Sequence, residues 1–305
     1  MSLPPTGEQH VLRSGDAEAV VVEVGGGLRT YRAGGRDVVD GFDAGEMAPD
    51  VRGNVLAPWP NRLRDGEWSW NGTALRTPVT EPERGTAIHG LVRHVAWRLL
   101  ARSDDAVVLE HLLHPQPGYP FSLRLRVGYE LSADGLRVTT TATNEGDADL
   151  PYGEGHHPYL AAGPGLRVDD CTLTLPAATR VLTDDRLLPV GSEPVEGTPF
   201  DLRGGRPVGD LVVDDCFTDL ARDADGTAEV RLVRPDGSGA AVWMDSSYGY
   251  LQVFTGDVVE PPSRRRLGLA VEPMTCPPDA FRSGEAVVRL EPGESRTGTW
   301  GIRPL

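Results

Sequence analysis

The sequence predicts an all-β protein, built as a large sandwich of antiparallel strands. Its 37 glycines and 26 prolines are spread over the whole 305-residue chain, which is typical of many short elements joined by turns. Several segments alternate apolar and polar residues with the period of two of a half-buried strand, and no segment has convincing helical periodicity. No linker or repeat divides the chain, so we expect a single domain over residues 1–305.

The clearest strand is residues 121–131, where every second residue from Phe121 to Leu131 is apolar. A turn at Ser132–Gly135 precedes a second alternating segment, Leu136–Ala142, so the two segments predict a hairpin. Further strands are expected at 19–24, 107–113, 166–175, 228–233, 240–244, 250–255, 267–271 and 285–290. Single helical turns are expected near 207–211 and 277–282, and residues 189–209 are interpreted as a long surface connection.

Composition excludes several classes of function. The 45 acidic residues outnumber 30 basic residues, all of them arginine, for a net charge of −15. This acidity argues against nucleic-acid binding. No apolar stretch is long enough to span a membrane, and the N-terminal residues lack the apolar core of a signal peptide. Three isolated cysteines fit a reducing compartment, so we expect a cytoplasmic protein.

Two adjacent histidines, His156 and His157, lie in the middle of the sequence Gly-His-His-Pro-Tyr. Successive side chains of an extended segment point to opposite faces. One imidazole is therefore expected to face a pocket while the other faces away, and Tyr159 shares a face with His157. Imidazole has an unperturbed pKa close to neutrality, so the pocket-facing ring is a candidate acid or base.

Two further clusters lie in loops rich in glycine and proline. Asn61 and Arg62 sit between Pro60 and Gly66, where a rigid loop would hold the planar guanidinium for sugar hydroxyls or a carboxylate. His89 precedes Gly90, which allows close approach of backbone or ligand to that histidine.

The remaining candidates belong to strands. Asp214 and Asp215 are neighbours, so only one of them can face a given pocket. Gln252 is an amide within an apolar strand and must find partners in the core or in a ligand. Glu272 is expected at the end of the strand 267–271, where desolvation would raise its pKa toward the range of a general base. Together with the histidines, these residues indicate a sugar site with an acid and a base.

A metal site is the alternative for the same side chains. His89, His157, Asp214 and Glu272 have suitable ligand types, but they are scattered singly along the chain without His-x-His spacing. We therefore expect no metal and no other cofactor.

With these residues in place, the chain resembles the aldose 1-epimerase (galactose mutarotase) family. The resemblance rests on six motifs in the family's order: PWPNRLRDGEWSWNG, AIHGLVRHVAW, GEGHHPYL, VDDCF, LQVFTGD and VEPMTCPPDAF. It implies a large antiparallel β-supersandwich, in agreement with the strand pattern.

The resemblance also implies roles for single residues. Glu272 is expected to be the general base, His157 the general acid and His89 a second active-site histidine at the sugar. The residues implied to bind sugar hydroxyls are Arg62, with Asn61 beside it, Asp214 and Gln252. Family members commonly have asparagine before the catalytic histidine and serine after it. His156 and Pro158 stand there in this chain, which leaves the identity of the sugar open.

The expected activity is interconversion of the α and β anomers of a free hexose such as glucose or galactose. The expected partner is a monosaccharide, bound by a monomer or homodimer. One alternative is a hexose-6-phosphate 1-epimerase, for which Arg93 and the run Arg264–Arg266 are the candidate phosphate ligands. Another is a sugar-binding protein or sensor without catalysis on the same fold.

Overall fold

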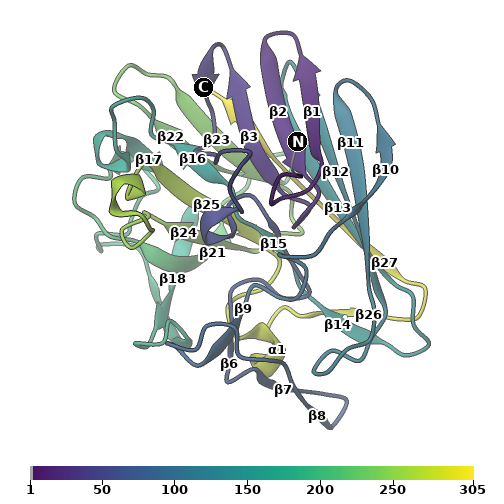
Figure 1. Cartoon of the computed structure of the whole chain (residues 1–305). Coiled ribbons are helices and arrows are strands. Elements are labelled where there is room, and N and C mark those ends of the chain that lie inside the picture. The colour runs from purple at the N-terminus through teal and green to yellow at the C-terminus, as the bar shows by residue number, and fades with distance from the viewer. Residues whose placement is uncertain (1–2) are drawn as a thin grey trace.

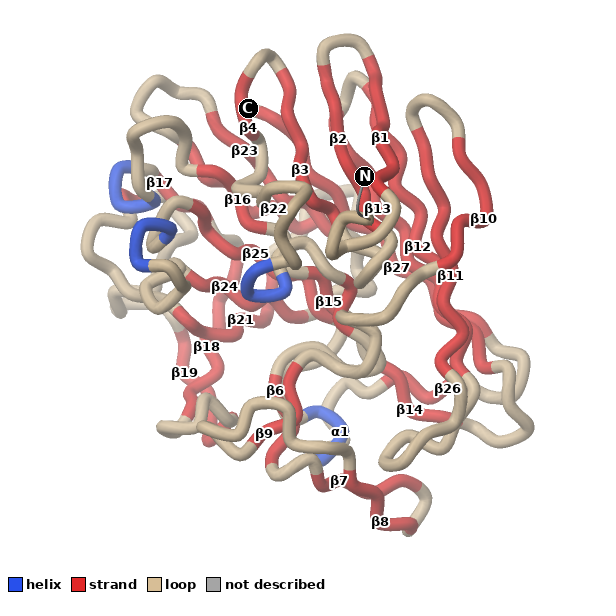
Figure 2. Tube along the Cα trace, viewed as in Figure 1, coloured by secondary structure: helices blue, strands red, loops and turns tan. Residues whose placement is uncertain are grey.

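Residues 3–305 are described by a computed structural model, and they form a protein made almost entirely of strands. Two large antiparallel sheets face each other, and smaller sheets and single helical turns surround them (Figures 1 and 2). This arrangement confirms the all-β, supersandwich-type fold expected from the sequence. Residues 1 and 2 of the N-terminal segment considered above lie outside the described part. Within residues 3–305, no helix has the length and the apolar character that crossing a membrane requires.

The larger sheet contains nine strands and is built around the hairpin expected from the sequence. Leu123 pairs with Asn144 at one end of this hairpin, and Ser132 pairs with Gly135 at its turn. In spatial order the strands are β10 (Arg98–Arg102), β11 (Ala106–Leu113), β12 (Leu123–Ser132), β13 (Gly135–Asn144), β27 (Ser295–Pro304), β23 (Gly239–Met244), β22 (Ala228–Val233), β17 (Thr172–Thr174) and β20 (Arg206–Pro207).

The second large sheet has eight strands and carries most of the candidate site. Along its main path the order is β19 (Pro189–Pro194), β18 (Ala177–Thr183), β21 (Asp214–Leu220), β24 (Tyr250–Phe254), β25 (Gly268–Met274), β15 (Gly155–His156) and β5 (Val55–Leu56). The eighth strand, β16 (Tyr159–Ala161), pairs with β25 beside this path.

The smaller elements cover the ends of the sandwich. A four-stranded sheet consists of β1 (Gln9–Ser14), β2 (Ala17–Val22), β3 (Leu28–Ala33) and β4 (Arg36–Asp37). Three strand pairs are β6 (Arg62–Arg64) with β9 (Thr86–Ile88), β7 (Glu67–Trp70) with β8 (Thr73–Arg76), and β14 (Leu150–Tyr152) with β26 (Val288–Leu290). The helical elements are the 3₁₀ turns η1 (Pro49–Val51), η2 (Val168–Asp170) and η3 (Pro262–Arg264), and the short helix α1 (Ala280–Ser283).

The hydrophobic core lies between the two large sheets. Leu125 and Val127 of β12 are fully buried, as are Leu251 and Val253 of β24, and all four belong to one cluster of buried residues. Alternate residues on β24 therefore point either into this core or toward the opposite face of the eight-stranded sheet. The second set supplies the site.

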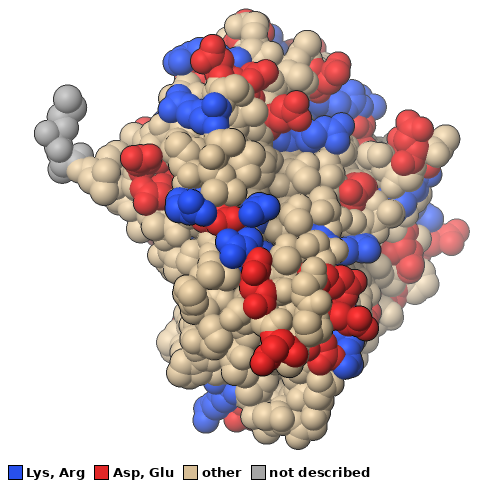
Figure 3. Space-filling model, turned by 90° about the vertical axis from the view of Figure 1, so that its right-hand side faces the viewer, with Lys and Arg blue, Asp and Glu red and all other residues tan. Residues whose placement is uncertain are grey.

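Arginines carry all the positive charge of the surface, and many of them lie beside carboxylates. On the face shown in Figure 3, arginines and acidic side chains lie next to one another. Typical exposed pairs are Arg13 with Glu18 at 2.8 Å and Arg36 with Asp236 at 3.0 Å.

Three expectations about local structure were wrong. The strand expected at 166–175 is instead the turn η2 followed by the short β17, because the Arg167 backbone N–H donates to the Asp170 carboxylate at 2.9 Å and closes a turn. The helical turn expected at 207–211 is absent, and Pro207 ends the edge strand β20, where a missing N–H is tolerated. Likewise, the connection expected at 189–209 begins with the strand β19.

The position of Glu272 also differs from expectation. The strand expected to end at 271 continues through Pro273 to Met274, so Glu272 lies inside β25 rather than at its end. This placement buries the carboxyl group more deeply than a strand end would, and Glu272 is 2% exposed.

Candidate active site

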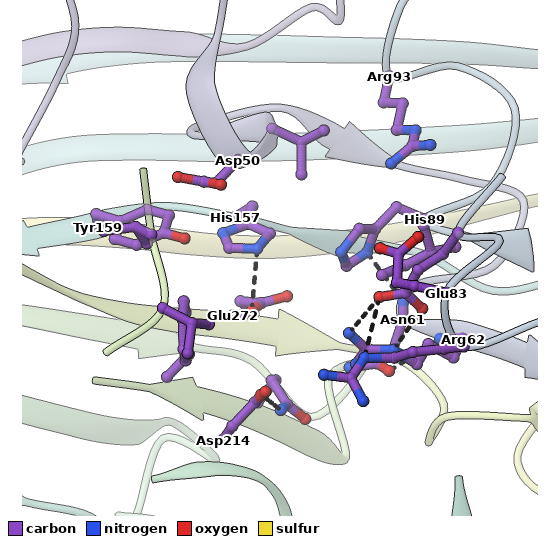
Figure 4. Close-up of a pocket in the computed structure, with 18 residues that line it drawn as sticks. Asp50, Asn61, Arg62, Glu83, His89, Arg93, His157, Tyr159, Asp214 and Glu272 are labelled. Atoms are coloured by element: carbon purple, nitrogen blue, oxygen red, sulfur yellow. Dashed lines mark hydrogen bonds and ion pairs between the residues drawn. The ribbon is translucent and has the colours of Figure 1, made fainter. Parts of the chain in front are cut away.

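A pocket of about 360 Å³ opens on the eight-stranded sheet, on the face away from the core. Strands supply its floor, and the loops before β6 and after β9 supply one wall (Figure 4). All the site residues expected from the sequence line this one pocket: Asn61, Arg62, His89, His157, Asp214, Gln252 and Glu272. The pocket thus brings together side chains that are separated by up to 211 positions in the sequence.

Strand register places the two central polar side chains beside each other. Gln252 of β24 pairs directly with Glu272 of β25, so both side chains point to the same face. The Gln252 Nε2 donates to Asp214 Oδ1 at 2.8 Å, whereas Gln252 Oε1 is buried and has no hydrogen-bond partner within residues 3–305. Glu272 Oε2 is also buried and has no hydrogen-bond partner within residues 3–305. The floor therefore presents two free acceptor oxygens to a ligand.

The pleat of β21 separates Asp214 from Asp215. Asp214 lines the pocket, whereas Asp215 accepts a hydrogen bond from Arg180 Nη2 at 2.8 Å on the opposite face. The sequence left open which of the two carboxylates faces the site, and the structure places Asp214 there.

The two adjacent histidines are separated in the same way. His156 Nε2 lies 3.0 Å from Thr140 Oγ1, and its ring packs against Trp300 with centroids 4.9 Å apart, so this imidazole belongs to the space between the sheets. His157 lines the pocket, and its Nε2 lies 3.3 Å from Glu272 Oε1. The expected split between the two faces is thus what the structure has.

Backbone bonds hold His89 against Asn61. The His89 N–H donates to the Asn61 carbonyl at 2.8 Å, and the Asn61 N–H donates to His89 Nδ1 at 3.2 Å. Because Nδ1 accepts, the proton of the neutral ring is on Nε2, which makes that nitrogen a donor. Gly90 is required next to it, since a Cβ at this position would lie 2.0 Å from the Ala57 carbonyl oxygen.

Arg62 is held by a carboxylate that the sequence analysis did not identify. Glu81 accepts from Arg62 Nε at 2.8 Å and from Nη2 at 2.9 Å, and Thr86 Oγ1 donates to the same carboxylate at 2.5 Å. Both members of the ion pair are 11% exposed. The guanidinium is therefore fixed in one plane, and Nη1 takes no part in the pair.

The acid–base pair has strongly perturbed titration. Burial raises the pKa of Glu272 well above its ordinary value, and the nearby Asp214 carboxylate adds to this effect. Burial lowers the pKa of His157 to about 3, and the Arg52 guanidinium adds to that effect. Both shifts have the same physical cause, because burial disfavours the charged form of each group.

The second histidine is also neutral. Burial lowers the pKa of His89 well below its ordinary value, and His157 contributes, with the two ring centroids 5.4 Å apart. His89 therefore offers a hydrogen-bond donor to the pocket without adding a charge.

Of the arginines considered for a phosphate, Arg93 alone lines the pocket. The run Arg264–Arg266 is engaged elsewhere. Arg264 bonds to the Gly41 carbonyl at 2.6 Å, Arg265 pairs with Glu260 at 2.7 Å, and Arg266 pairs with Asp257 at 2.6 Å. Carbonyl and carboxylate groups of the protein thus hold all three of these arginines. Among residues 3–305, no group of three or more His, Cys, Asp or Glu side chains is arranged to hold a metal ion.

Sequence reasoning missed several residues of the pocket. Asp50 lies in the 3₁₀ turn η1 and Glu81 in the connection before β9, neither of which has a recognisable motif, and only the fold brings them to the site. Tyr159 was expected on the His157 face, and its ring stacks on His157 with centroids 5.1 Å apart, but no role was assigned to it. The signal that could have placed Tyr159 in the site was its spacing, because in an extended segment Tyr159 lies on the same face as His157, two residues before it.

The chain is similar to known proteins over nearly its whole length. A family model described as aldose 1-epimerase matches residues 8–303. The protein YihR of Escherichia coli strain K12, itself described as uncharacterized, is 32% identical over 290 residues, which cover 95% of this chain and 91% of YihR.

Solved structures show the same fold at low sequence identity. A GalM/aldose epimerase homologue from C. elegans has a TM-score of 0.85 at 18% identity, with 98% of both chains covered. A galactose mutarotase-like protein from Clostridium acetobutylicum has a TM-score of 0.83 at 18% identity, covering 97% of this chain and 94% of that one. With the family model matched from residue 8 to residue 303, this chain belongs to the aldose 1-epimerase family.

Proposed function

We propose that the protein is an aldose 1-epimerase that interconverts the α and β anomers of a free hexose by acid–base catalysis. The observation that carries the proposal is the contact between Glu272 Oε1 and His157 Nε2, at 3.3 Å in a pocket lined with hydrogen-bonding side chains. A pure sugar-binding site needs the hydroxyl partners but has no use for a buried carboxyl beside a buried imidazole.

The reaction requires two proton transfers at neighbouring atoms. The anomeric hydroxyl and the ring oxygen are bonded to the same carbon, so two groups in contact with each other can address both. Glu272 takes the proton of the anomeric hydroxyl while His157 gives a proton to the ring oxygen, and the ring opens to the aldehyde. Rotation about the C1–C2 bond and closure in reverse give the other anomer.

Burial of the pair sets which of its protonation states is lower in free energy. Before opening, the proposed roles place a carboxylate on Glu272 and an imidazolium on His157; after it, both groups are neutral. The pKa of Glu272 is raised and that of His157 is lowered by the same burial, so the neutral state is the one the pocket prefers. Sugar hydroxyls that donate to Glu272 would stabilise the carboxylate form before the reaction. The pair then returns to its starting state on closure, as a catalyst must.

The remaining polar groups suit the other hydroxyls of a sugar. Arg62 Nη1 and the neutral His89 are donors, whereas Asp214 and Gln252 Oε1 are acceptors. A pyranose hydroxyl both donates and accepts, so such a mixed set can hold it in one orientation. Fixed orientation of the reacting carbon contributes to the rate in its own right.

The test is anomer exchange measured by proton NMR, with Glu272→Gln as the decisive variant. This change keeps the volume of the side chain but removes its ability to accept a proton. We expect the exchange rate to fall by roughly 10²–10⁴-fold, with sugar affinity changed far less. A folded Glu272→Gln protein with normal exchange would contradict the mechanism. If the unmutated protein binds sugar without accelerating exchange, it is a sensor instead.

The phosphosugar alternative is tested in the same assay. Free hexoses are favoured because five acidic side chains line the pocket, Asp50, Glu81, Glu83, Asp214 and Glu272, and the run Arg264–Arg266 is absent from it. Glucose and galactose should therefore be turned over faster than their 6-phosphates. A clear preference for a 6-phosphate would assign the substrate to the alternative and direct attention to Arg93.

A further inference from the structure

Tyr159 has a buried hydroxyl that no other residue satisfies. The side chain lines the pocket and is 2% exposed, yet its phenol oxygen has no hydrogen-bond partner among residues 3–305. The hydroxyls of four other buried tyrosines donate to protein oxygens, as that of Tyr129 does to the Gly26 carbonyl at 2.7 Å; the others are Tyr119, Tyr152 and Tyr248. An unpaired buried hydroxyl is unfavourable, so its position at a ligand pocket indicates that the partner is a ligand.

Strand pairing places this hydroxyl next to the acid–base pair. Tyr159 of β16 pairs with Ala270 of β25, and Glu272 lies two residues further along β25 on the same face. The two side chains are therefore diagonal neighbours across adjacent strands. In Figure 4 the phenol oxygen points toward the part of the pocket that holds His157 and Glu272.

The phenol ring is fixed by its neighbours. The Arg52 guanidinium carbon lies 3.8 Å from the ring centroid, and the His157 ring stacks on the phenol at an interplanar angle of 13°. Arg52 is itself 2% exposed and donates to the Asp40 carbonyl at 3.1 Å. A cation at the ring withdraws electron density from it and strengthens the hydroxyl as a donor.

The hydroxyl remains protonated under working conditions. Burial raises the pKa of Tyr159 well above its ordinary value, and the Glu272 and Asp50 carboxyl groups add to this effect. Tyr159 is accordingly a hydrogen-bond donor and not a competing base.

We propose that the Tyr159 hydroxyl donates a hydrogen bond to the anomeric oxygen of the sugar, which makes Tyr159 a further substrate-contacting residue. The inference rests on the proposed epimerase function. A hydroxyl placed between Tyr159 and Glu272 accepts from the phenol while it donates to the unpaired Glu272 Oε2. When Glu272 takes the proton, the anomeric oxygen becomes the carbonyl oxygen of the open chain and still accepts from Tyr159. The phenol thus stabilises the electron density that this oxygen gains as it loses its proton.

The test is Tyr159→Phe, which removes one oxygen atom and keeps the ring against His157 and Arg52. We expect kcat to fall about 10- to 100-fold with KM changed less than about threefold, as for a donor that acts mainly in the transition state. The melting temperature should stay the same or rise, because the lost hydroxyl has no protein partner.

Tyr129→Phe is the matched control. It also removes a buried phenol oxygen, but one that donates to a protein carbonyl and belongs to a residue that does not line the pocket. This variant should have a lower melting temperature and an unchanged kcat, the opposite pattern to Tyr159→Phe.

Three outcomes would overturn the inference. The first is an unchanged kcat in Tyr159→Phe. The second is a change confined to KM, which would place the hydroxyl at a non-reacting part of the sugar. The third is a lowered melting temperature, which would reveal a protein partner of the hydroxyl.

These results are separable from failure of the proposed function. An unmutated protein that does not accelerate exchange, or a fully active Glu272→Gln protein, defeats the function itself. Normal exchange that is lost in Glu272→Gln but retained in Tyr159→Phe defeats only the role of Tyr159.

Discussion

At the scale of single residues, the site is built by separating chemically identical neighbours. His156 and His157 are adjacent, as are Asp214 and Asp215, and in each pair one member faces the pocket while the other bonds to the protein. The strand pleat alone produces this separation. His156 and Asp215 each have a protein partner, Thr140 and Arg180 respectively. The pairs therefore offer matched variants in which the same chemical change is made on either side of the sheet.

The aspartate pair gives a prediction about binding. Asp214→Asn should raise KM about tenfold or more, because a hydrogen bond to a charged group is worth about 1.5–3 kcal/mol, while kcat changes less. Asp215→Asn should leave KM unchanged and lower the free energy of unfolding by about 1–2 kcal/mol, since it weakens the pairing of the half-buried Arg180. Steady-state kinetics and urea unfolding measure the two effects. Equal effects of both variants on KM would contradict the assignment of Asp214 to the site.

At the scale of elements, the pair β6–β9 carries the loop side of the pocket. Arg62 begins β6 and pairs with Ile88 of β9, directly before His89. Glu81 lies in the connection before β9 and bridges to Thr86 through the backbone. The ion pair between Glu81 and Arg62 therefore ties this connection to the site, and it acts on the substrate only through Arg62.

Glu81→Gln tests that link. Loss of the carboxylate removes the charged partner that fixes the Arg62 plane, so KM should rise about 3- to 10-fold while kcat changes less. Glu83→Gln is the control, because Glu83 also lines the pocket but is exposed and not paired with Arg62. If Glu83→Gln raises KM as much as Glu81→Gln does, the effect comes from pocket charge and not from the orientation of Arg62.

At the scale of the whole molecule, a second buried carboxyl links separate parts of the chain. Glu154 accepts from Tyr152 Oη at 2.5 Å and from Tyr248 Oη at 2.8 Å, and burial raises its pKa to about 7. It lies beside Thr275, whose hydroxyl accepts from the Glu154 N–H at 2.9 Å, three residues after Glu272. A change in the ionisation of Glu154 is therefore expected to change the stability of the whole protein.

Glu154 predicts a pH dependence of stability. A carboxyl whose pKa is raised on folding contributes stability that is present in full below its unfolded pKa and is lost as the pH rises through about 7. Between pH 5 and pH 8 this loss amounts to about 2–3 kcal/mol. The free energy of unfolding in urea should therefore fall between pH 5 and pH 8 by about 2–3 kcal/mol less in Glu154→Gln than in the unmutated protein. Parallel pH profiles would show that Glu154 titrates normally.

Comparing Glu154→Gln with the unmutated protein removes the contributions of other buried groups to the pH dependence of stability. His156 and His157 have pKa values lowered by burial, so their contribution is lost as the pH falls below the ordinary histidine range. This trend opposes that of Glu154 in the same window. Because both histidines are present in each protein, the difference between the two profiles isolates Glu154.

Local patterns predicted the strands well where one face is dry and the other wet. The hairpin of β12 and β13 and the strand 228–233 follow from alternation alone, because each residue reports its own environment. Prediction was poor where long-range pairing decides the structure. The strand expected to end at residue 271 continues, because β24 pairs with β25 through Met274 and keeps the chain extended. A local contact was also missed, since side-chain capping by Asp170 replaced an expected strand with a turn.

The sequence by itself determined the fold class, the family resemblance and the residue types of the site, because these are recorded in local periodicity and in short motifs. The tertiary structure alone decided that Glu81 holds Arg62 and that Tyr159 presents an unpaired hydroxyl beside Glu272. It also decided how far burial shifts the pKa values of Glu272 and His157. These properties depend on what surrounds a side chain from distant strands, and a linear pattern contains no information about such neighbours until the sheets have formed.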